Sequence, residues 1–278
     1  MVGKTKIDKL IIQEKKYFLP ILKRQEAAST KIKKKWRKET LLQRKERLSR
    51  EVHQIYNHTV QFGHFKGMKI SNKVWWGKLD LASMILGTYE QEIVDYIFSK
   101  DCKEYSNFIN IGAGDGFYSC GLLYSKRMQN CLAFEKSPQG RKSIKINSDL
   151  NHINNLKIFG SVNSNIYKKV QNLELNRTLI LVDIEGDEFS LLDKKFLNFF
   201  QNSILIIEIH NWIKNFWSKY ENLLHIANNY FLIDFIKLKK KNLYNFKELR
   251  DFTDDNRLLL TSESRPCLMR YLILKPKN

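Results

Sequence analysis

The sequence predicts an α/β protein with a mostly parallel β-sheet that helices cover on both faces. From residue 107 onward, short β-branched runs alternate with segments of helix length, which is typical of βαβ units. A glycine-rich turn, INIGAGDG at residues 109–116, joins the first run to an amphipathic segment. The apolar content of 43% in 278 residues suffices for a full-sized core. The predicted strands are NFINI, NCLAFE, LKIFG, TLILVDI, SILIIEIH, YFLIDFI and MRYLILKP.

A basic arm precedes this sheet. Residues 1–55 hold 17 Lys or Arg against 6 Asp or Glu, so most of the formal net charge of +19 belongs to the arm. Because residues 21–58 contain no Gly or Pro, we expect a helix there with a narrow apolar stripe. We therefore divide the chain into a basic N-terminal helical extension, 1–58, and a main domain, 59–278. The stripe comprises Ile32, Trp36, Leu41, Leu48, Val52 and Ile55.

The arm has more than one interpretation. Its stripe packs on the body or on a second copy of the chain, or residues 1–55 bind nucleic acid, an anionic lipid surface or an acidic partner.

Two other segments connect the predicted elements. Residues 62–77 contain three glycines and predict a loop or short hairpin, followed by one helix over about 78–99. The last two strands are joined by a polar loop in which we expect no strong helix.

The chain shows no sign of export. Its first residues carry charges where a signal peptide has an apolar core, and no apolar run approaches the roughly 20 residues of a membrane span. The cysteines include no C-x-x-C pair, so we expect separate reduced thiols. We expect a cytoplasmic protein without a transmembrane segment.

The glycine-rich turn predicts a nucleotide-like ligand, with a simple tight turn as the alternative. Gly112, Gly114 and Gly116 are spaced as G-x-G-x-G, and the third glycine of the dinucleotide pattern would fall on Phe117. The carboxylate of Asp115 in this turn favours a cationic ligand over a pyrophosphate.

A carboxylate follows the second predicted strand. Glu135 ends NCLAFE, nineteen residues after Gly116, where an acid can accept hydrogen bonds from both hydroxyls of a ribose. The alternative is a surface acid at a strand end.

Further polar residues follow the fourth and fifth predicted strands. In LILVDIEGDEFSLL, Asp183 and Glu185 precede a helix and are site candidates, whereas we interpret Asp187 and Glu188 as charges at the helix N-terminus. In SILIIEIH, His210 is a candidate general base because its ordinary pKa lies near neutrality. Its alternative role is a hydrogen-bonded group under a loop.

These stretches resemble the FkbM-type methyltransferases, a branch of the class I superfamily. INIGAGDGFYS, LAFEKSP, LVDIEGDEFSLL, IIEIH and the upstream GTYEQEIVDYI carry the resemblance, over roughly residues 60–275. It implies a Rossmann-like, seven-stranded sheet whose last strand is antiparallel, with S-adenosylmethionine as the methyl donor. It also implies O-methylation of a hydroxyl on a sugar, glycan or other small metabolite.

The resemblance assigns roles by position. Asp183 and Glu185 would face the crevice of methyl transfer, with His210 as the first candidate base and Asp183 as the second. Tyr89 and Glu90, on the helix before the sheet, would close the donor pocket, unless they are an ordinary half-buried helix surface. The residues expected to bind the donor are Asn110, Gly112, Gly114, Asp115, Gly116, Glu135, Tyr89 and Glu90.

Asn110 departs from the family pattern, which commonly has an acid two residues before the first glycine. An asparagine still accepts a hydrogen bond from the donor's ammonium group but lacks the charge. The donor therefore binds more weakly unless Asp115 compensates.

Three alternatives stay open. A metal-assisted reaction could use Asp183, Glu208, His210 and Asn211, but their spacing matches no recognised signature and we assign no metal ligand. A nucleic-acid methyltransferase could use the basic arm, although the chain lacks an Asn/Asp-Pro-Pro-Tyr motif. A non-catalytic protein that retains the sheet would explain Asn110.

Overall fold

The computed structural model describes residues 39–236, 252–263 and 270–277, together with residues 16, 20, 246 and 249. The expected helix before residue 39 and most of the segments 237–251 and 264–269 lie outside the described residues.

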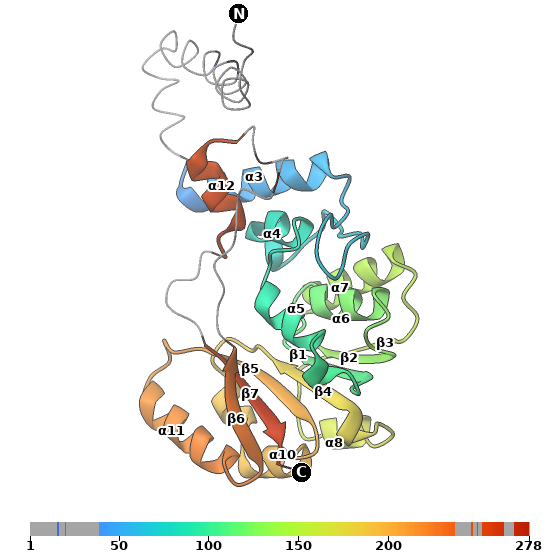
Figure 1. Ribbon diagram of the computed structural model, residues 1–278, viewed down its shortest axis with the longest axis vertical. Helices are drawn as coiled ribbons and strands as arrows, with labels where there is room; N and C mark the ends of the chain where they lie inside the picture. The colour runs from blue at the N-terminus through green and yellow to red at the C-terminus, as the bar shows by residue number, and fades with distance from the viewer. Residues whose placement is uncertain are drawn as a thin grey trace, which may run out of the picture.

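A seven-stranded sheet forms the centre of the molecule (Figure 1), in the order β3-β2-β1-β4-β5-β7-β6. The first five strands pair in parallel, and β7 runs antiparallel to both β5 and β6. The predicted Rossmann-like sheet with an antiparallel last strand is therefore confirmed. The strands are β1 (Asn107–Ile111), β2 (Asn130–Phe134), β3 (Leu156–Phe159), β4 (Thr178–Val182), β5 (Ile204–Ile209), β6 (Phe231–Ile236) and β7 (Arg270–Pro276).

The central strands are apolar on both sides because both faces of the sheet are covered. All residues of β1, β4 and β5 are buried. Phe108 and Leu179 belong to the core on one face, whereas their neighbours Ile109 and Ile180 belong to the core on the other. This alternation follows from the two-residue period of a strand.

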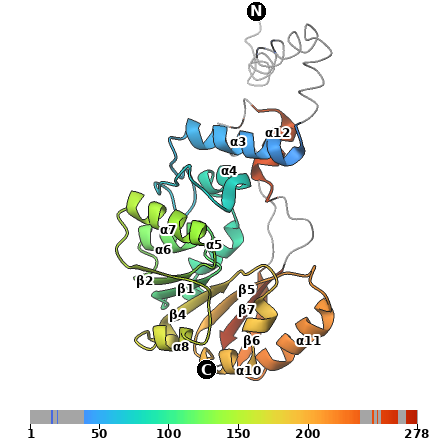
Figure 2. The same cartoon turned by 180° about the vertical axis from the view of Figure 1, so that it is seen from behind.

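Helices cover the sheet as the βαβ pattern predicts. In both views α6 and α7 lie side by side (Figures 1 and 2), and residues of α6 pack into the first core. Residues of α10 and α11 pack into the second core. The helices that follow β1 to β5 are α6 (Phe117–Tyr124), α7 (Pro138–Leu150), α8 (Ile166–Lys169), α9 (Glu188–Leu191), α10 (Lys194–Phe199) and α11 (Phe216–Ala227), with the 3₁₀ turn η3 (Leu175–Arg177) before β4.

Part of the basic arm is helical, as expected. Helix α3 (Leu41–Ile55) begins at a capping box formed by Thr40 and Gln43. Of the predicted apolar stripe, Leu48 and Val52 are buried, but Leu41 and Ile55 are exposed because the helix rests on the body through its middle turns only. There the fully buried Lys45 forms an ion pair with Asp80 at 2.8 Å.

The prediction of a single helix over residues 78–99 is wrong. The segment folds as η1 (Gly77–Leu79), α4 (Leu81–Ile85), α5 (Gln91–Ile97) and η2 (Lys100–Cys102). The chain turns at Gly87 and Glu90, which both have left-handed φ angles, of 67° and 42°. A Cβ on Gly87 would lie 2.2 Å from the carbonyl oxygen of Phe62, so the turn is needed for this close approach. A loop or short hairpin was expected at residues 62–77, and an antiparallel bridge joins Lys69 in this segment to Thr59, which precedes it.

A helix also stands between the last two strands, where none was expected. Helix α12 (Asp254–Thr261) is capped by Thr253 and buries Leu259 and Leu260. It packs against α3 and α4 (Figure 1). Tertiary contacts thus stabilise a short helix in a stretch that reads as polar.

No helix among the described residues is both long and apolar enough to cross a membrane. Cys102, Cys120 and Cys131 are free and buried, as expected for reduced thiols.

Candidate active site

The predicted site residues follow the carboxyl ends of neighbouring parallel strands, where open α/β sheets bind ligands. The turn of residues 112–116, which we call the glycine turn, follows β1, and Glu135 follows β2. Asp183 follows β4 and His210 follows β5. The structure therefore brings residues from four strands to one edge of the sheet.

The three glycines of the turn have different reasons to lack a side chain. All have positive φ angles, of 87°, 54° and 83°. A Cβ on Gly112 would lie 1.6 Å from the carbonyl oxygen of Asp183, and a Cβ on Gly116 would lie 3.1 Å from Ile144. A Cβ on Gly114 would meet nothing nearer than Trp76, at 3.9 Å. Packing explains Gly112 and Gly116, so only Gly114 has open space beside it.

Asp115 has a structural task that the sequence did not reveal. Its buried carboxylate accepts hydrogen bonds from the backbone N–H groups of Trp75, Trp76 and Gly77, at 2.7 to 2.8 Å. These bonds hold the segment 75–77 over the glycine turn. We expected this carboxylate to face a cationic ligand, but it accepts these three backbone hydrogen bonds instead.

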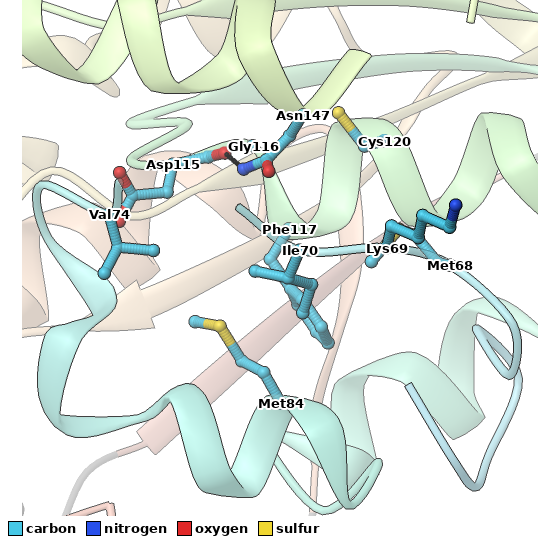
Figure 3. A pocket seen from close by; sticks show the side chains of 10 residues that line it. All are labelled: Met68, Lys69, Ile70, Val74, Met84, Asp115, Gly116, Phe117, Cys120 and Asn147. Atoms are coloured by element: carbon cyan, nitrogen blue, oxygen red, sulfur yellow. Dashed lines mark hydrogen bonds between the residues drawn. The ribbon is translucent and has the colours of Figure 1, made fainter. Parts of the chain in front are cut away.

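A small cavity lies behind the glycine turn (Figure 3). It is lined mostly by apolar side chains, including Met68, Met84 and Phe117. Its volume of about 10 Å³ leaves room for one water molecule at most. Beside it, the Asn147 amide donates to the carbonyl oxygen of Asp115 at 2.8 Å. This side of the turn is filled by the protein itself.

Glu135 points toward the glycine turn. One carboxylate oxygen accepts the N–H of Gly114 at 2.8 Å, and the other accepts the N–H of Ser137 at 2.7 Å. A carboxylate has about four acceptor positions, so each oxygen can accept a further hydrogen bond. Gly140, which sequence reasoning missed, makes room for this side chain, since a Cβ there would lie 2.7 Å from Cγ of Glu135.

Asn110 leaves a buried acceptor unused. Its amide donates to the Ser119 hydroxyl at 3.0 Å, while its Oδ1 is buried and has no hydrogen-bond partner. A buried polar atom without a hydrogen-bond partner is unfavourable. This oxygen can therefore accept a hydrogen bond from an N–H or O–H group of a ligand.

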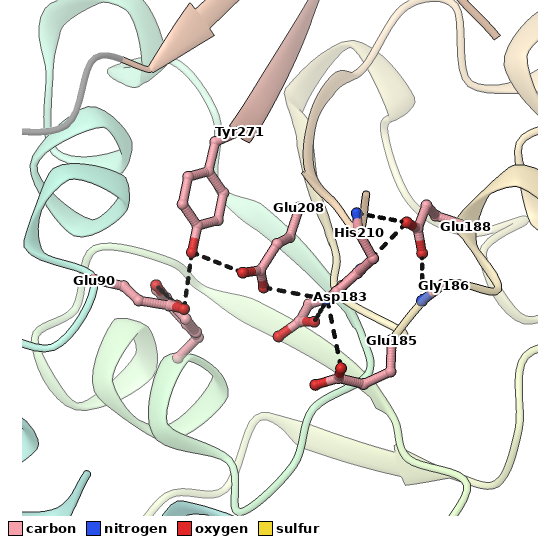
Figure 4. Close-up of polar contacts among 9 residues, drawn as sticks. Glu90, Asp183, Glu185, Gly186, Glu188, Glu208, His210 and Tyr271 are labelled. Carbon is pink, nitrogen blue, oxygen red and sulfur yellow. Dashed lines mark hydrogen bonds and ion pairs between the residues drawn. The ribbon is translucent and has the colours of Figure 1, made fainter. Parts of the chain in front are cut away.

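The second group of residues surrounds His210 (Figure 4). We call Asp183, Glu185, Glu188, Glu208 and His210 the histidine cluster. Nε2 of His210 lies 3.6 Å from Asp183 Oδ1, 3.6 Å from Glu185 Oε2 and 4.0 Å from Glu208 Oε2. The ring itself is only 2% exposed. The predicted residues Asp183, Glu185 and His210 are thus side by side.

Glu188 fixes the position of the ring. Its fully buried Oε1 lies 3.2 Å from Nδ1 of His210 and accepts the backbone N–H of the same residue at 2.9 Å. Its Oε2 accepts the N–H of Gly186 at 2.8 Å. Sequence reasoning treated Glu188 as a charge at a helix N-terminus, and α9 does begin there. Its contact with His210 depends on the tertiary fold, and no local pattern signals it.

The carboxylates change the proton affinity of the cluster. Burial lowers the pKa of His210, but the hydrogen bond and charge of Glu188, together with the charges of Glu208 and Glu185, outweigh burial, so that pKa lies above its ordinary value. Burial, together with the charge of Glu208, raises the pKa of Asp183 well above its usual range. Both groups therefore bind protons more tightly than in an unfolded chain.

Glu90 belongs to the same network. The hydroxyl of Tyr118 donates to Glu90 at 2.6 Å, and the hydroxyl of Tyr271 lies 2.9 Å from Glu90 and 3.1 Å from Glu208 (Figure 4). Tyr271, on β7, therefore connects the carboxyl groups of Glu90 and Glu208 through its hydroxyl.

Tyr89 and Glu90 lie on the turn before α5 and not on a helix, which corrects their expected position. Tyr89 packs edge-on against Phe117, with ring centres 5.4 Å apart. It also lines a cavity of about 360 Å³ together with Phe62, Phe65 and other side chains. Whether it closes a donor pocket stays a prediction.

No family model and no curated protein matches the chain. Several solved structures are similar in outline. The ribosomal protein L11 methylase of Lactobacillus delbrueckii subsp. bulgaricus is 14% identical, with 69% of this chain and 79% of that chain covered and a TM-score of 0.41. A putative SAM-dependent methyltransferase from Streptococcus mutans is 11% identical, with 75% and 51% covered and a TM-score of 0.45. The M. jannaschii TYW2 structure in complex with AdoMet is 14% identical, with 68% and 74% covered and a TM-score of 0.38.

Similarity at this level is too low for an argument about activity. The fold rests on the strand order, and the resemblance to FkbM-type enzymes rests on the sequence motifs.

Proposed function

We propose that the protein is an S-adenosylmethionine-dependent methyltransferase of the FkbM type, which methylates a hydroxyl group of a sugar, glycan or other small metabolite. The observation that carries this proposal is the position of Glu135. Its carboxylate lies at the end of β2 and touches Gly114, the glycine whose open side packing does not explain. A carboxylate beside bare backbone at neighbouring strand ends suits a ribose diol next to the glycine turn.

The described residues fit S-adenosylmethionine. Glu135 would accept hydrogen bonds from the ribose hydroxyls with the acceptor positions that Gly114 and Ser137 leave free. The unpartnered Oδ1 of Asn110 would accept from the ammonium group. When bound, this cofactor supplies a methyl group that its sulfonium makes electrophilic. Gly112, Gly116 and Asp115, whose structural tasks are described above, are less informative about the donor.

The histidine cluster would handle the proton of the acceptor. Glu188 accepts from Nδ1 of His210, which leaves Nε2 to take a proton from a hydroxyl. A positioned base of this kind contributes about 10²- to 10⁴-fold to the rate. Burial of the ring keeps bulk water away, and correct placement of the acceptor oxygen can contribute about 7 to 11 kcal/mol. Asp183 is the second candidate for the same role.

A nucleic-acid acceptor is the alternative. It depends on the basic residues before position 39, of which only Lys16 is among the described residues. The acidic side chains of the histidine cluster would repel a phosphate backbone, which favours a neutral hydroxyl acceptor.

Calorimetric titration of the full chain with S-adenosylmethionine tests the proposal. We expect binding that Glu135→Ala weakens about tenfold or more, since a hydrogen bond to a charged group contributes roughly 1.5 to 3 kcal/mol. Glu135→Gln should lose less, because its amide oxygen still accepts. Glu174→Ala, at an acid exposed before η3, is the matched control and should bind as the wild type does.

Absence of binding at millimolar donor would contradict the proposal. Donor turnover against a panel of glycans, lipids and RNA, with and without residues 1–38, then identifies the acceptor class.

A further inference from the structure

We propose that Asp183, Glu185 and His210 form a binding site for a divalent transition-metal ion. The ion would hold the acceptor hydroxyl, and this second part rests on the proposed function. The three residues come from the loop after β4 and the end of β5.

The spacing of the ligand atoms suits a metal ion. One atom from each residue can be chosen so that all three lie within 4.8 Å of one another. Nε2 of His210 is 3.6 Å from an oxygen of Asp183 and 3.6 Å from an oxygen of Glu185, which is too long for a hydrogen bond. Ligand atoms about 2.1 Å from a tetrahedral ion lie about 3.4 Å from one another. The two separations from Nε2 are close to that value, and the oxygens of Asp183 and Glu185 lie within 4.8 Å of each other, so side-chain movements can bring all three onto one ion.

The histidine is arranged as a metal ligand. Metal-binding histidines usually donate their second ring N–H to a carboxylate, which fixes the tautomer. Here Nδ1 faces the fully buried Glu188 at 3.2 Å, and Nε2 is left facing Asp183 and Glu185. Glu188 also accepts the N–H of Gly186, which follows Glu185. One buried carboxylate therefore positions both segments that carry the ligands.

Asp183 provides an independent observation. Its side chain is 28% exposed, yet its Oδ1 is buried and has no hydrogen-bond partner. This is the same oxygen that faces Nε2 of His210. A lone pair on the oxygen and a lone pair on the nitrogen repel each other unless a proton or a metal ion lies between them. At 3.6 Å the two atoms are too far apart to share a proton in a hydrogen bond, and this spacing suits a metal ion.

The ligand types indicate the ion. One imidazole and two carboxylates suit Mn²⁺, Fe²⁺ or Zn²⁺ better than Mg²⁺ or Ca²⁺, which prefer oxygen alone. Three protein ligands leave positions open for an acceptor oxygen. A bound ion lowers the pKa of a coordinated hydroxyl, so the hydroxyl loses its proton to solvent or a carboxylate. His210 then acts as a ligand and no longer as the proton acceptor.

Binding of Mn²⁺ to the chelator-treated full chain tests the site, with free Mn²⁺ followed by electron paramagnetic resonance. We expect one site, and nitrogen coupling from one imidazole in the bound spectrum. Asp183→Asn, Glu185→Gln and His210→Gln should each weaken binding at least about tenfold, and His210→Gln should remove the nitrogen coupling. Zn²⁺ should displace Mn²⁺ from the same site.

Asp187→Asn is the matched control, because this exposed carboxylate lies in the same loop but makes no side-chain cap to α9. It should bind Mn²⁺ as the wild type does. Glu185 is 49% exposed, so Glu185→Gln gives a folded variant even where a substitution at a buried position does not. Circular dichroism checks each fold. Absence of binding at 1 mM Mn²⁺, or equal loss in the Asp187 variant, overturns the site.

The two proposals fail separately. Metal titration needs no methyl donor, and donor titration of the chelated protein needs no metal. Methyl transfer that stops after chelation and returns with Mn²⁺ supports the role in holding the acceptor. Full turnover by metal-free protein overturns that role.

Discussion

Carboxylates at the same edge of the sheet have opposite surroundings in the glycine turn and in the histidine cluster. Asp115 and Glu135 accept hydrogen bonds from five backbone N–H groups in total, within the turn and beside it. Asp183 instead faces a histidine and further carboxylates, and one of its oxygens has no hydrogen-bond partner. The first region uses negative charge to hold its own backbone. In the second region, Oδ1 of Asp183 is a buried acceptor that no donor of the described residues reaches.

The difference shows that an acid near a ligand site need not bind the ligand. Backbone donors neutralise Asp115, so its charge stabilises the loop of residues 75–77. Burial, and then repulsion from neighbouring acids, raises the pKa of Asp183, which is typical of a carboxyl group in a functional site.

The largest expected effect is a loss of stability on substitution of Asp115 in the glycine turn. Asp115→Ala leaves three buried or half-buried N–H groups without an acceptor, so we expect the free energy of unfolding to fall by more than about 3 kcal/mol. Urea denaturation measures it. Asp115→Asn keeps one acceptor oxygen and should lose less. A loss below about 1 kcal/mol would mean that these bonds do not hold the loop.

A smaller effect of opposite sign is expected in the second region. Asp183→Asn removes a carboxyl group that burial and the charge of Glu208 keep from ionising, and it breaks no hydrogen bond of Oδ1, so metal-free protein should gain about 1 kcal/mol of stability. The same urea experiment, in the presence of a chelator, measures it. Asp187→Asn, which is exposed, should change stability by less than about 0.5 kcal/mol. A loss as large as that of Asp115→Ala would remove the contrast between the regions.

The smallest expected effect is a change in the pH dependence of stability, and it concerns the buried histidines His53 and His210. His53 is as buried as His210, but its Nε2 donates to the carbonyl oxygen of Ile70 at 2.7 Å and its Nδ1 contacts His58, with no carboxylate bonded to it. Burial therefore lowers the pKa of His53 below 6.5, whereas the pKa of His210 is raised.

The folded state then binds fewer protons than the unfolded state at His53. Its contribution to stability is complete above the unfolded pKa of about 6.5 and is lost as the pH falls from there through the lower pKa of the folded state. Between pH 7 and pH 5, His53→Gln should lose less stability than the wild type, with a difference of at most about 1.4 kcal/mol per pH unit. His225→Gln, exposed on α11, should follow the wild type. Identical slopes for His53→Gln and the wild type would show that its surroundings do not disfavour the charge.

The sheet could be predicted because its central strands are buried on both faces. Runs such as NFINI and TLILV are almost continuously apolar, and the glycines between them mark the turn. Helix α12 was missed because its local signals, Thr253 and two acids in its first turn, lie in a polar stretch. The break at Gly87 was missed because its cause is the carbonyl of Phe62, which only the fold brings near.

The candidate site was predictable in position but not in its contacts. Asp183, Glu185 and His210 follow strand ends, and parallel strands place their ends at one edge. The partners of Asp115 lie 38 to 40 residues before it in the chain, and Glu188 is 22 residues from His210. Such distances leave no periodic pattern for a sequence to show.

Gly112 joins the two regions through the backbone. Any side chain there would collide with the carbonyl of Asp183, while the N–H of Asp183 donates to Ile111 at 2.9 Å. The strand that carries the first turn and the strand that carries the second cluster therefore form one rigid unit. This packing fixes the distance between the glycine turn and the histidine cluster, so a side chain at position 112 would disturb both regions at once.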